Sequence, residues 1–349
     1  MPTIAPAPLE AYVAAIFAKV GCEPAEAGAI ARRLVGANLA GHDSHGVVRV
    51  ADYVERLTTD RVAPNRHVEV VAESDAFAVL DGGGGFGQVI GAEAMAIGMA
   101  KARRQGVALL ALRRAHHLGR IGDWAEECAA GGFASVHFVN AVDLPPIVAP
   151  FGGRDRRVST NPFCCGMPRA DGRHLILDFA TSKVAEGKVM VARNKGVEVS
   201  GGCIIDAEGR PSRDPADLYA GGALLPFGEH KGYGLSFFCE ILAGALTGGG
   251  CHHEARPDVG RIHNNMLSIV VDPRRVGDSS AILAEVERHV AWTRASRPAV
   301  PGGEVMVPGD PERRTREERA RDGIPLDAET WRQLLRAGER VGVAAPAVA

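Results

Sequence analysis

Histidine, serine and arginine gather in the stretch 40–57, which reads A-G-H-D-S-H-G-V-V-R-V-A-D-Y-V-E-R-L. On a helix, His45 and Arg49 would lie one turn apart and point the same way. An imidazole beside a guanidinium suits proton transfer next to a bound carboxylate. Ser44 adds a hydroxyl to this group. A capped surface helix with a structural histidine explains the spacing equally well, because helix starts collect polar residues.

A second group of this kind follows an expected strand at 107–112 and reads A-H-H-L-G-R-I-G-D. A strand that ends in histidines and glycines before a helix is how α/β proteins present functional groups at the carboxyl edge of a sheet. Consecutive side chains on an extended segment face opposite ways, so one of His116 and His117 is expected to be structural.

Two further segments could hold a nucleotide. The segment 175–182 reads L-I-L-D-F-A-T-S, and its backbone N–H groups and hydroxyls could hold a ribose or a pyrophosphate. A capped helix is an equally good interpretation. In G-E-H-K-G-Y-G-L (228–235), Lys231 lies between glycines ahead of an expected helix at 235–246, as in a phosphate-contacting turn, although the segment is not a Walker A motif.

A glycine-rich turn at 82–87 satisfies G-x-G-x-x-G between a strand and a helix. The dinucleotide fingerprint also needs an acidic residue at the end of the next strand. That strand ends in Arg113 and Arg114 instead, which could accept a 2'-phosphate and so leave NADP on a Rossmann domain as an alternative. A flexible turn ahead of a helix is the simpler interpretation.

Composition narrows the class of protein. A chain of 349 residues with 46% hydrophobic content can bury a large core and is expected to form two domains. A net charge of −2 argues against nucleic acid or an anionic membrane as partner. Seven scattered cysteines without a C-x-x-C pair indicate reduced thiols. With no signal peptide and no apolar stretch long enough to cross a bilayer, the chain is expected to be cytoplasmic.

The histidines could also suggest a metal site, and with it a metal-dependent hydrolase. Candidate ligands are His42, His45, His116, His117 and the segment 251–253. No two of them have a recognised ligand spacing such as H-E-x-x-H, so no metal is expected.

Hydrophobic periodicity predicts the elements that position these groups. Asp43 or Ser44 is the expected N-cap of the helix at 47–57. The segment 312–321 is expected to be a solvated helix face whose charges pair with one another, and 341–349 a loose tail. The other expected helices are 8–40 with a break near Gly21, 89–103, 281–293 and 330–341, and the other expected strands are 68–73, 76–81, 133–140 and 263–273.

Five motifs, in order, carry a family resemblance: G-H-D-S-H-G-V-V-R, H-H-L-G-R-I-G, T-N-P with L-D-F-A-T-S, L-L-P-F-G-E-H-K-G-Y-G-L, and P-G-D-P-E-R-R with R-D-G-I-P-L. Over about residues 8–340 the chain resembles the type 2 malate/L-lactate dehydrogenases, a family that includes sulfolactate and ureidoglycolate dehydrogenases and cyclic imino-acid reductases. It looks most like the hydroxycarboxylate dehydrogenase branch.

The resemblance implies an α/β protein with the non-Rossmann NAD(P)-binding fold of the sulfolactate dehydrogenase type. In that fold a mixed sheet is covered by helices, and the N- and C-terminal segments form a mainly helical domain. The expected domains are 1–75 with 311–349, and 76–310. The family implies a homodimer with the cofactor near the subunit interface, NAD as cofactor with NADP as the alternative, and no role in cofactor binding for the glycine-rich turn.

The resemblance also assigns residues. His45 and His117 match proton-transfer positions, with His45 also a cofactor contact. The matched cofactor-binding positions are Gly119, Arg120, Ile121, Asn140, Leu177, Asp178, Phe179, Ala180, Lys231, Gly232, Asp310, Pro311, Glu312 and Arg313. Two positions depart from the family pattern: Asp310 replaces a common glutamate, and Ser159 replaces a glycine before T-N-P.

The expected reaction is hydride transfer between nicotinamide and a 2-hydroxy acid or 2-keto acid, with malate, lactate, hydroxypyruvate or phenylpyruvate as candidates. His117 is the expected base, since an imidazole titrates near neutral pH. His45 is a second proton donor or a nicotinamide contact, and Arg49 is the partner of the substrate carboxylate. The alternatives are reduction of a cyclic imine, metal-dependent hydrolysis and nucleotide binding without turnover.

Overall fold

A seven-stranded mixed sheet forms the centre of the protein. The computed structural model describes residues 2–254, 256 and 260–346. The strand order is β2-β3-β4-β11-β5-β6-β7, in which β3 and β4 run parallel and all other neighbours run antiparallel. The α/β class with a mixed sheet is therefore confirmed. The strands are β2 (Glu69–Glu73), β3 (Phe77–Asp81), β4 (Val107–Ala115), β5 (Ala134–Val142), β6 (Phe163–Met167), β7 (Leu175–Phe179) and β11 (His263–Val271).

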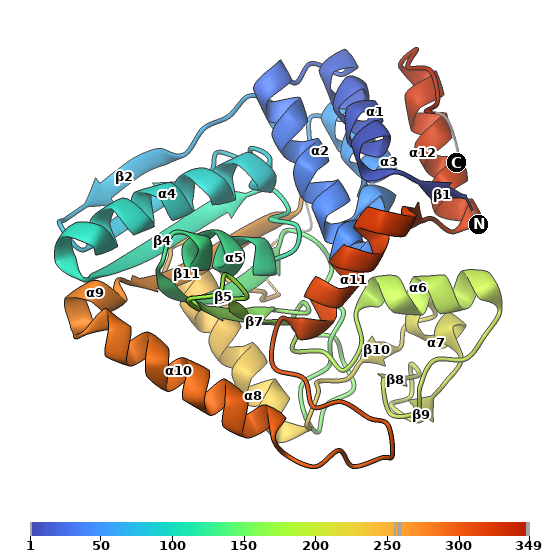
Figure 1. Cartoon of the computed structure of the whole chain (residues 1–349). Helices are drawn as coiled ribbons and strands as arrows, with labels where there is room; N and C mark the ends of the chain where they lie inside the picture. The colour runs from blue at the N-terminus through green and yellow to red at the C-terminus, as the bar shows by residue number, and fades with distance from the viewer. Residues whose placement is uncertain (1, 255, 257–259, 347–349) are drawn as a thin grey trace.

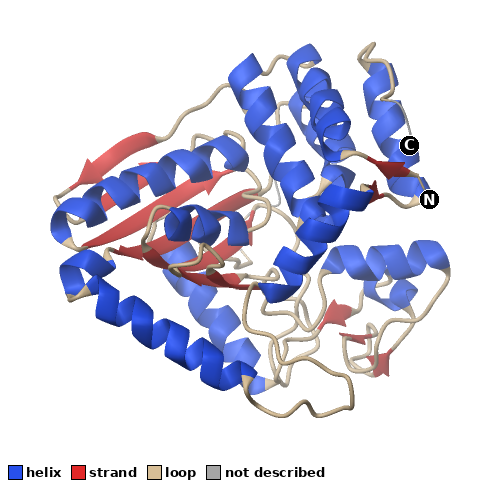
Figure 2. Ribbon diagram, in the orientation of Figure 1, coloured by secondary structure: helices blue, strands red, loops and turns tan. Residues whose placement is uncertain are grey.

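Helices cover the sheet on both sides (Figures 1 and 2). Helices α4 (Gly87–Gln105) and α5 (Gly122–Ala130) pack on one face, while α8 (His230–Cys239) and the π-helical turn Glu240–Ala245 pack on β5 and β11. The alternation of β4 explains its placement, because Leu110 and Leu112 are fully buried while Val107 and Leu109 remain exposed on the other face.

The two ends of the chain build a helical layer beside the sheet (Figure 1). Its apolar core is formed by side chains from α1 (Pro6–Lys19), α2 (Pro24–Leu39), α3 (Val50–Thr58) and α12 (Ala328–Arg340). Strands β1 (Thr3–Ile4) and β12 (Ile324–Pro325) pair with each other and join the two ends. Helix α11 (Asp310–Asp322) lies between this layer and the sheet.

Smaller elements lie at the periphery. A three-stranded sheet in the order β10-β8-β9 packs with α6 (Glu186–Lys195) and α7 (Pro215–Tyr219) around a separate apolar cluster. Helices α9 (Pro273–Val276) and α10 (Ser279–Arg294) follow β11. The strands of the small sheet are β8 (Ile204–Ile205), β9 (Pro211–Ser212) and β10 (Ala223–Leu224).

Two predicted helix starts are wrong. The helix expected at 47–57 is preceded by two 3-10 turns, Asp43–His45 and Val47–Arg49, and neither Asp43 nor Ser44 caps it. The Asp43 carboxylate accepts hydrogen bonds from Asn38 and Arg319 instead. The helix expected at 235–246 begins at His230 and becomes π-helical at Glu240, so Lys231 lies inside its first turn.

The charged helix near the C-terminus is not mainly self-paired. Arg316 of α11 pairs with Glu126 of α5, Arg319 pairs with Asp43, and Glu312 contacts His42. These partners come from the sheet region and from the loop after α2, so α11 connects separate parts of the chain.

Two expectations about apolar residues also fail. Trp292, one of the apolar residues that define the helix expected at 281–293, is 76% exposed on α10, and Val290 is the residue of that helix that is buried. In the segment 341–349, Val341 and Val343 pack against the helical core rather than lying loose, and 347–349 lie outside the described residues.

Seven cysteines are free, and no disulfide links Cys164 to Cys165. Within the part of the chain that the structure describes, no helix is long and apolar enough to cross a membrane.

Candidate functional site

The imidazoles of His45 and His117 meet between the helical layer and the sheet. Their rings stack with centroids 5.6 Å apart and planes inclined by 14°. His45 ends the 3-10 turn after α2, and His117 follows β4, so the two come from segments far apart in sequence. Both residues are half-buried, so the site that they form is not sealed inside the core.

Asn38, near the end of α2, fixes the loop that carries His45. Its Oδ1 accepts a hydrogen bond from the Val47 backbone at 2.8 Å, and its Nδ2 donates to Asp43 at 2.6 Å. The Asn38 amide lies against Gly46, where an added Cβ would fall 2.2 Å from Oδ1. The loop can therefore close around Asn38 only with glycine at position 46.

Ser44 connects the other members of the first group. Its hydroxyl lies 3.1 Å from His45 Nδ1, and its carbonyl accepts a hydrogen bond from Arg49 Nε at 2.7 Å. The terminal nitrogens of Arg49 make no hydrogen bond to another described residue, so they remain available to a ligand. Gly187 in the first turn of α6 packs on Ser44, which closes this side of the site.

Tyr53 fixes the His117 ring through a hydrogen bond to Nδ1. The phenol oxygen of Tyr53 lies 2.5 Å from His117 Nδ1, and Gln88 Nε2 donates to the same oxygen at 3.3 Å. Tyr53 and Gln88 are almost completely buried. No described residue bonds to His117 Nε2, so that nitrogen remains available to a ligand.

His116 is the structural member of the pair. It is fully buried, and its ring packs edge-on against Tyr53 at 5.2 Å and Phe86 at 5.8 Å. Neither of its ring nitrogens has a hydrogen-bond partner. One of two consecutive histidines was expected to be structural. His116 is that residue, because its side chain is buried in the core.

Burial disfavours the charged forms of the two histidines of the site. It lowers the pKa of His45 to about 3, and the nearby charge of Arg49 acts in the same direction. Burial, then Arg49 and His45, also hold the pKa of His117 well below its usual value. Burial raises the pKa of Tyr53, so its phenol keeps its proton.

The glycine-rich turn positions the histidine segment. A Cβ at Gly87 would lie 2.4 Å from the His117 carbonyl oxygen and 2.5 Å from Leu118 Cα. Helix α4 can therefore start directly beneath His117 only because position 87 has no side chain. Arg113 and Arg114, the alternative partners of a 2'-phosphate, both bind the buried carboxylate of Asp81.

Arg120 lies between the histidines and a second group of charges. Its fully buried guanidinium pairs with Asp123 and Glu126, both at 2.9 Å. Burial alone would lower the pKa of Arg120, but these carboxylates raise it. Asp178, at the end of β7, lies close by and accepts a hydrogen bond from the Gly122 backbone at 2.7 Å.

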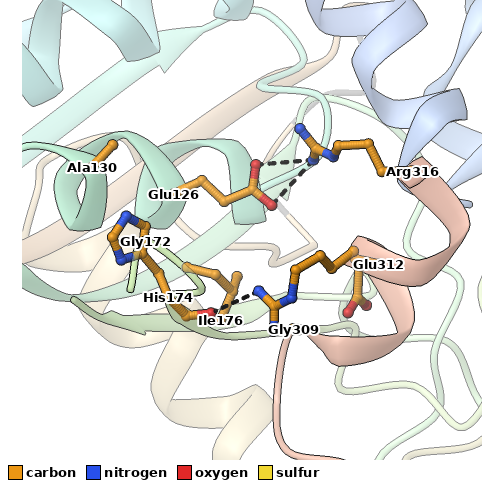
Figure 3. A pocket seen from close by; sticks show the side chains of 9 residues that line it. Glu126, Ala130, Gly172, His174, Ile176, Gly309, Glu312 and Arg316 are labelled. Carbon is orange, nitrogen blue, oxygen red and sulfur yellow. Dashed lines mark hydrogen bonds and ion pairs between the residues drawn. The ribbon is translucent and has the colours of Figure 1, made fainter. Parts of the chain in front are cut away.

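A pocket of about 330 Å³ opens beyond this charge cluster (Figure 3). Glu126 of α5 and Arg316 of α11 pair across it, and Arg313 reaches the His174 carbonyl. Its lining is Glu126, Ala130, Gly172, His174, Ile176, Gly309, Glu312, Arg313 and Arg316. Two of the predicted cofactor contacts, Glu312 and Arg313, therefore line one pocket.

Other predicted cofactor positions serve as internal anchors. The Asn140 amide is fully buried and bonds to Glu240, Gly250 and Asn265. Asp310 accepts hydrogen bonds from Arg294 and Arg313. In this fold, Pro311 follows Asp310 in the first turn of α11, and Ile121 immediately precedes α5.

The segment around Lys231 lies against the end of β7. The rings of Phe227 and Phe179 meet edge-to-face at 5.2 Å, and the Phe227 N–H donates to the Thr181 carbonyl. Gly232 allows this turn, because a Cβ there would lie 1.9 Å from the Phe227 oxygen. The turn thus brings the chain around Lys231 next to the predicted contacts Leu177 to Ala180.

Asn264 and Asn265 bind the backbone of the histidine segment. Asn264 Oδ1 accepts from the Leu118 N–H, and Asn265 Oδ1 accepts from the Arg114 N–H. Both amides are buried and hold the histidine segment to β11.

Two residues of the site escaped the sequence reasoning. Tyr53 lies on the apolar side of the helix expected at 47–57, and Gln88 lies between the glycine-rich turn at 82–87 and the helix expected at 89–103. A signal existed for Tyr53, because it lies four residues after Arg49 and so shares its helix face. Nothing in the sequence singles out Gln88.

Within the described residues, no group of three or more His, Cys, Asp or Glu side chains is arranged to hold a metal ion.

Comparisons with known proteins identify the family. Residues 4–335 match the family model of malate/L-lactate dehydrogenase. Hydroxycarboxylate dehydrogenase B of Escherichia coli K12 is 45% identical, covering 96% of this chain and 93% of its own. A Δ1-pyrroline-2-carboxylate/Δ1-piperideine-2-carboxylate reductase of Pseudomonas putida is 33% identical, over 91% of this chain and 92% of the reductase. The solved sulfolactate dehydrogenase of Methanocaldococcus jannaschii superposes with a TM-score of 0.88 at 30% identity, covering 98% of each chain. The chain belongs to the malate/L-lactate dehydrogenase family.

Proposed function

We propose that the protein is an NAD-dependent oxidoreductase that interconverts a 2-hydroxy acid and the corresponding 2-keto acid. The observation that carries this proposal is the stacked pair His45 and His117, with the free end of Arg49 on the same loop. Together they offer a group that can take up a proton and a group that can hold a carboxylate in one partly exposed site.

The residues present fit a nicotinamide dinucleotide. Nε of the buried Arg120 lacks a hydrogen-bond partner, whereas its two terminal nitrogens pair with Asp123 and Glu126, so the site holds one unused donor for a phosphate or ribose oxygen. The Asp178 carboxylate near Arg120 could accept from a ribose hydroxyl. A continuous series of groups, from His45 through Arg120 to Glu126, connects the histidines with the pocket. A dinucleotide bound along this series would have its reactive ring at the histidines.

His117 would act as the general base in the oxidation direction. When bound, the nicotinamide accepts the hydride from the carbon that bears the hydroxyl and supplies it in the reverse direction. His117 Nε2 is open to the site and would take the hydroxyl proton, while Tyr53 fixes the ring through Nδ1. His45, stacked on His117, would shield this proton transfer from water and is the second candidate donor, with Ser44 orienting its ring.

Arg49 would bind the substrate carboxylate. Its Nε is occupied by the Ser44 carbonyl, which fixes the plane of the guanidinium. The two terminal nitrogens then form a preorganised fork for two parallel hydrogen bonds. This geometry selects substrates whose carboxylate is adjacent to the reacting carbon.

The charges of the pocket favour NAD over NADP. Arg316 is engaged by Glu126, and Arg313 by Asp310, so neither arginine is free to bind a 2'-phosphate. Two carboxylates, Glu126 and Glu312, line the same pocket. Carboxylates attract ribose hydroxyls and repel phosphate, so we infer tighter binding of NADH than of NADPH.

We further propose that the protein is a homodimer formed through the end of α8 and the π-helical turn that follows it. Phe237, Phe238, Ile241 and Leu246 leave 38–60% of their surfaces exposed on one continuous segment. Large apolar side chains gathered in this way mark an interaction surface. Helix α8 begins at His230 and Lys231, so the interface would adjoin the cofactor site, as in a family dimer. Because this apolar surface is continuous with the helix that begins at the cofactor site, we propose that a second copy of this chain binds to it.

A spectrophotometric panel tests the proposal. Malate, lactate, hydroxypyruvate and phenylpyruvate, together with a cyclic imino acid, are assayed with NAD(H) and NADP(H) at the reduced-nicotinamide absorbance. We expect turnover of at least one hydroxy or keto acid with NAD(H). Turnover of the imino acid alone would favour the second candidate, imine reduction, which the relationship to the Pseudomonas reductase supports. No turnover of any substrate would refute the proposed activity.

Replacement of His117 tests its role within that reaction. We expect His117→Ala to lower kcat about 10²–10⁴-fold, the usual contribution of a general base, with the Kd for NADH unchanged. His289→Ala, which removes an exposed histidine on α10, is the control and should leave kcat unchanged. An unchanged kcat in His117→Ala would move the base to His45.

A further inference from the structure

We infer that the glycine-rich turn 82–87 and Asn265 together hold a one-residue bulge at Arg114, and that this bulge positions His117 in the site. The proposed function leaves the turn without a role in cofactor binding, and the bulge gives it a different one. The inference rests on the proposed function for its catalytic consequence.

The bulge lies near the end of β4, where this strand has one more residue than β11 between two paired positions. Arg113 and Arg114 lie opposite the single residue Asn265. Arg114 has a φ of 54°, a left-handed conformation that favours glycine and is foreign to a strand. The flanking pairs are Leu112 with Met266 and Ala115 with Asn264.

The bulge decides which of the two consecutive histidines reaches the site. Without it, Arg114 would take the buried position that Ala115 holds. Every later residue would then advance by one place along the sheet. His116 would lie where His117 now stacks on His45. The extra residue therefore places His117, and not His116, beside His45.

The buried amide of Asn265 stabilises the bulge. The extra residue of a bulge is left without a partner in the ladder of strand hydrogen bonds. Asn265 Oδ1 supplies that partner by accepting a hydrogen bond from the Arg114 N–H at 2.9 Å. The Asn265 side chain is fully buried, and its Nδ2 donates to Asn140 Oδ1 at 2.9 Å, so the amide is held in this orientation.

The glycine-rich turn binds the other backbone groups of the bulge. Glycine at position 82 permits the close approach, because a Cβ there would lie 2.9 Å from the Ala115 Cα. The glycines thus serve the end of a strand and not a pyrophosphate. Three backbone N–H groups donate across this contact at 2.8–2.9 Å: Gly82 to the Arg113 carbonyl, Gly84 to the Arg114 carbonyl, and His116 to the Gly85 carbonyl.

The left-handed backbone of Arg114 allows a test that changes no residue of the site. Arg114→Gly and Arg114→Val both remove the guanidinium and its ion pair with Asp81. They differ in that glycine accepts a positive φ without strain, whereas β-branched valine does not. We expect kcat of Arg114→Val to be about 10–10²-fold below that of Arg114→Gly, the usual cost of a misplaced catalytic group, with the Kd for NADH unchanged.

The same two substitutions at Arg113 are the matched control. Arg113 also pairs with Asp81, but it lies in β4 without a positive φ. Valine suits such a strand position better than glycine. Arg113→Val should therefore be at least as active as Arg113→Gly, the reverse of the order at position 114.

Nuclear magnetic resonance reports the position of His117 without any substrate. In protein whose histidines carry 13C at Cε1, the His117 signal is shifted by the stacked ring of His45, and it is assigned by its loss in His117→Gln. We expect Arg114→Val to move this signal and Arg114→Gly to leave it at the wild-type position. If Arg114→Val does not fold, Arg114→Ala takes its place, because alanine also disfavours a positive φ.

An unmoved His117 signal in the valine or alanine variant would overturn the inference, as would equal kcat values in the variants at position 114. The resonance measurement does not depend on catalysis. If no hydroxy acid turns over but the signal moves in Arg114→Val and not in Arg114→Gly, the proposed function fails while the role of the bulge stands.

Discussion

His116 contacts no substrate group in this arrangement, yet it should govern how the protein responds to acid. Burial lowers its pKa to about 3, and the positive charges of Arg56 and His263 act in the same direction. The folded state therefore binds fewer protons than the unfolded chain, whose histidines titrate near pH 6.5. The contribution of His116 to stability is complete above about pH 6.5 and is lost progressively as the pH falls toward 3.

His116→Phe removes this titration while keeping an aromatic ring against Tyr53 and Phe86. We expect the urea midpoint to fall less between pH 7.5 and pH 4.5 in this variant than in the wild type. His137, another buried histidine with a pKa near 3, keeps part of the dependence. His289→Phe, at an exposed position, should reproduce the wild-type slope, and equal slopes in all three proteins would contradict the assignment to His116.

At the scale of single residues, the sequence located the groups with unusual chemistry but not their supports. His45, Arg49 and His117 carried visible signals because charged and titratable side chains cluster near turns. Tyr53 and Gln88 carried little, since a tyrosine on an apolar helix face and a glutamine at a helix start are ordinary. Their roles depend on contacts made across the fold, which spacing along the chain does not encode.

At the scale of elements, the start of α4 controls the position of His117. Gly87→Ala would place a methyl group against the His117 carbonyl and Leu118 Cα, which are backbone atoms and cannot turn aside. We expect a loss of about 1–3 kcal/mol in unfolding free energy, as for other overpacked sites, together with a fall in kcat.

Gly36→Ala is the matched control for this substitution. Position 36 lies within α2, and an added Cβ there meets nothing within 4 Å. Because alanine favours helix over glycine, this variant should be stabilised by about 0.5–1 kcal/mol. The measurements are the unfolding free energy by chemical denaturation and kcat, for both variants. An unchanged unfolding free energy and kcat in Gly87→Ala would contradict the predicted clash with the His117 backbone.

Helix α11 should support the catalytic loop through Arg319. This guanidinium bonds the Asn38 carbonyl and the Asp43 carboxylate, which together frame the turn that ends at His45. Arg319→Ala should loosen that turn and raise the substrate KM several-fold, with a smaller effect on stability. Arg321→Ala removes a similar arginine, which among the described residues pairs with its neighbour Asp322 alone, and should leave KM unchanged. Equal KM values in both variants would contradict a role of Arg319 in supporting the catalytic loop.

Periodicity predicted most helices and strands, because side chains on this sheet and these helices alternate between core and solvent in the ordinary way. The predictions failed where tertiary contacts override local preference. The Asp43 carboxylate is taken by Asn38 and Arg319 and so cannot cap the following helix. The arginines of α11 find partners on other elements, which a count of nearby charges along the sequence cannot reveal.

At the scale of the whole molecule, the exposed apolar segment of α8 predicts the oligomeric state. Phe238→Asp places a charge where a dimer would bury a ring that is 59% exposed in the single chain. We expect light scattering coupled to size-exclusion chromatography to give a dimer for the wild type and a monomer for this variant. Trp292→Asp, at another exposed aromatic on α10, should remain dimeric. A monomeric wild type would refute the proposed dimer.

We propose that the helical layer, from residues 1–75 and 311–349, and the sheet region, from residues 76–310, are separate domains, except that β2 (Glu69–Glu73) pairs with β3 and so belongs to the sheet region. Their apolar clusters are distinct, with Leu34 in one and Leu110 in the other. The apolar cluster of the helical layer could be predicted, because the sequence shows amphipathic helices at both ends of the chain. The way the two clusters meet depends on side-chain contacts and could not be predicted.

The stacking of His45 on His117 has a consequence for how the protein gains and loses activity. One imidazole is anchored in the helical layer and the other at the edge of the sheet, so neither body contains a working site by itself. During refolding, turnover should appear only with the last step, when the two bodies meet, and later than the far-ultraviolet circular dichroism signal of the helices. An enzymatic assay would then report the docking of the helical layer onto the sheet region.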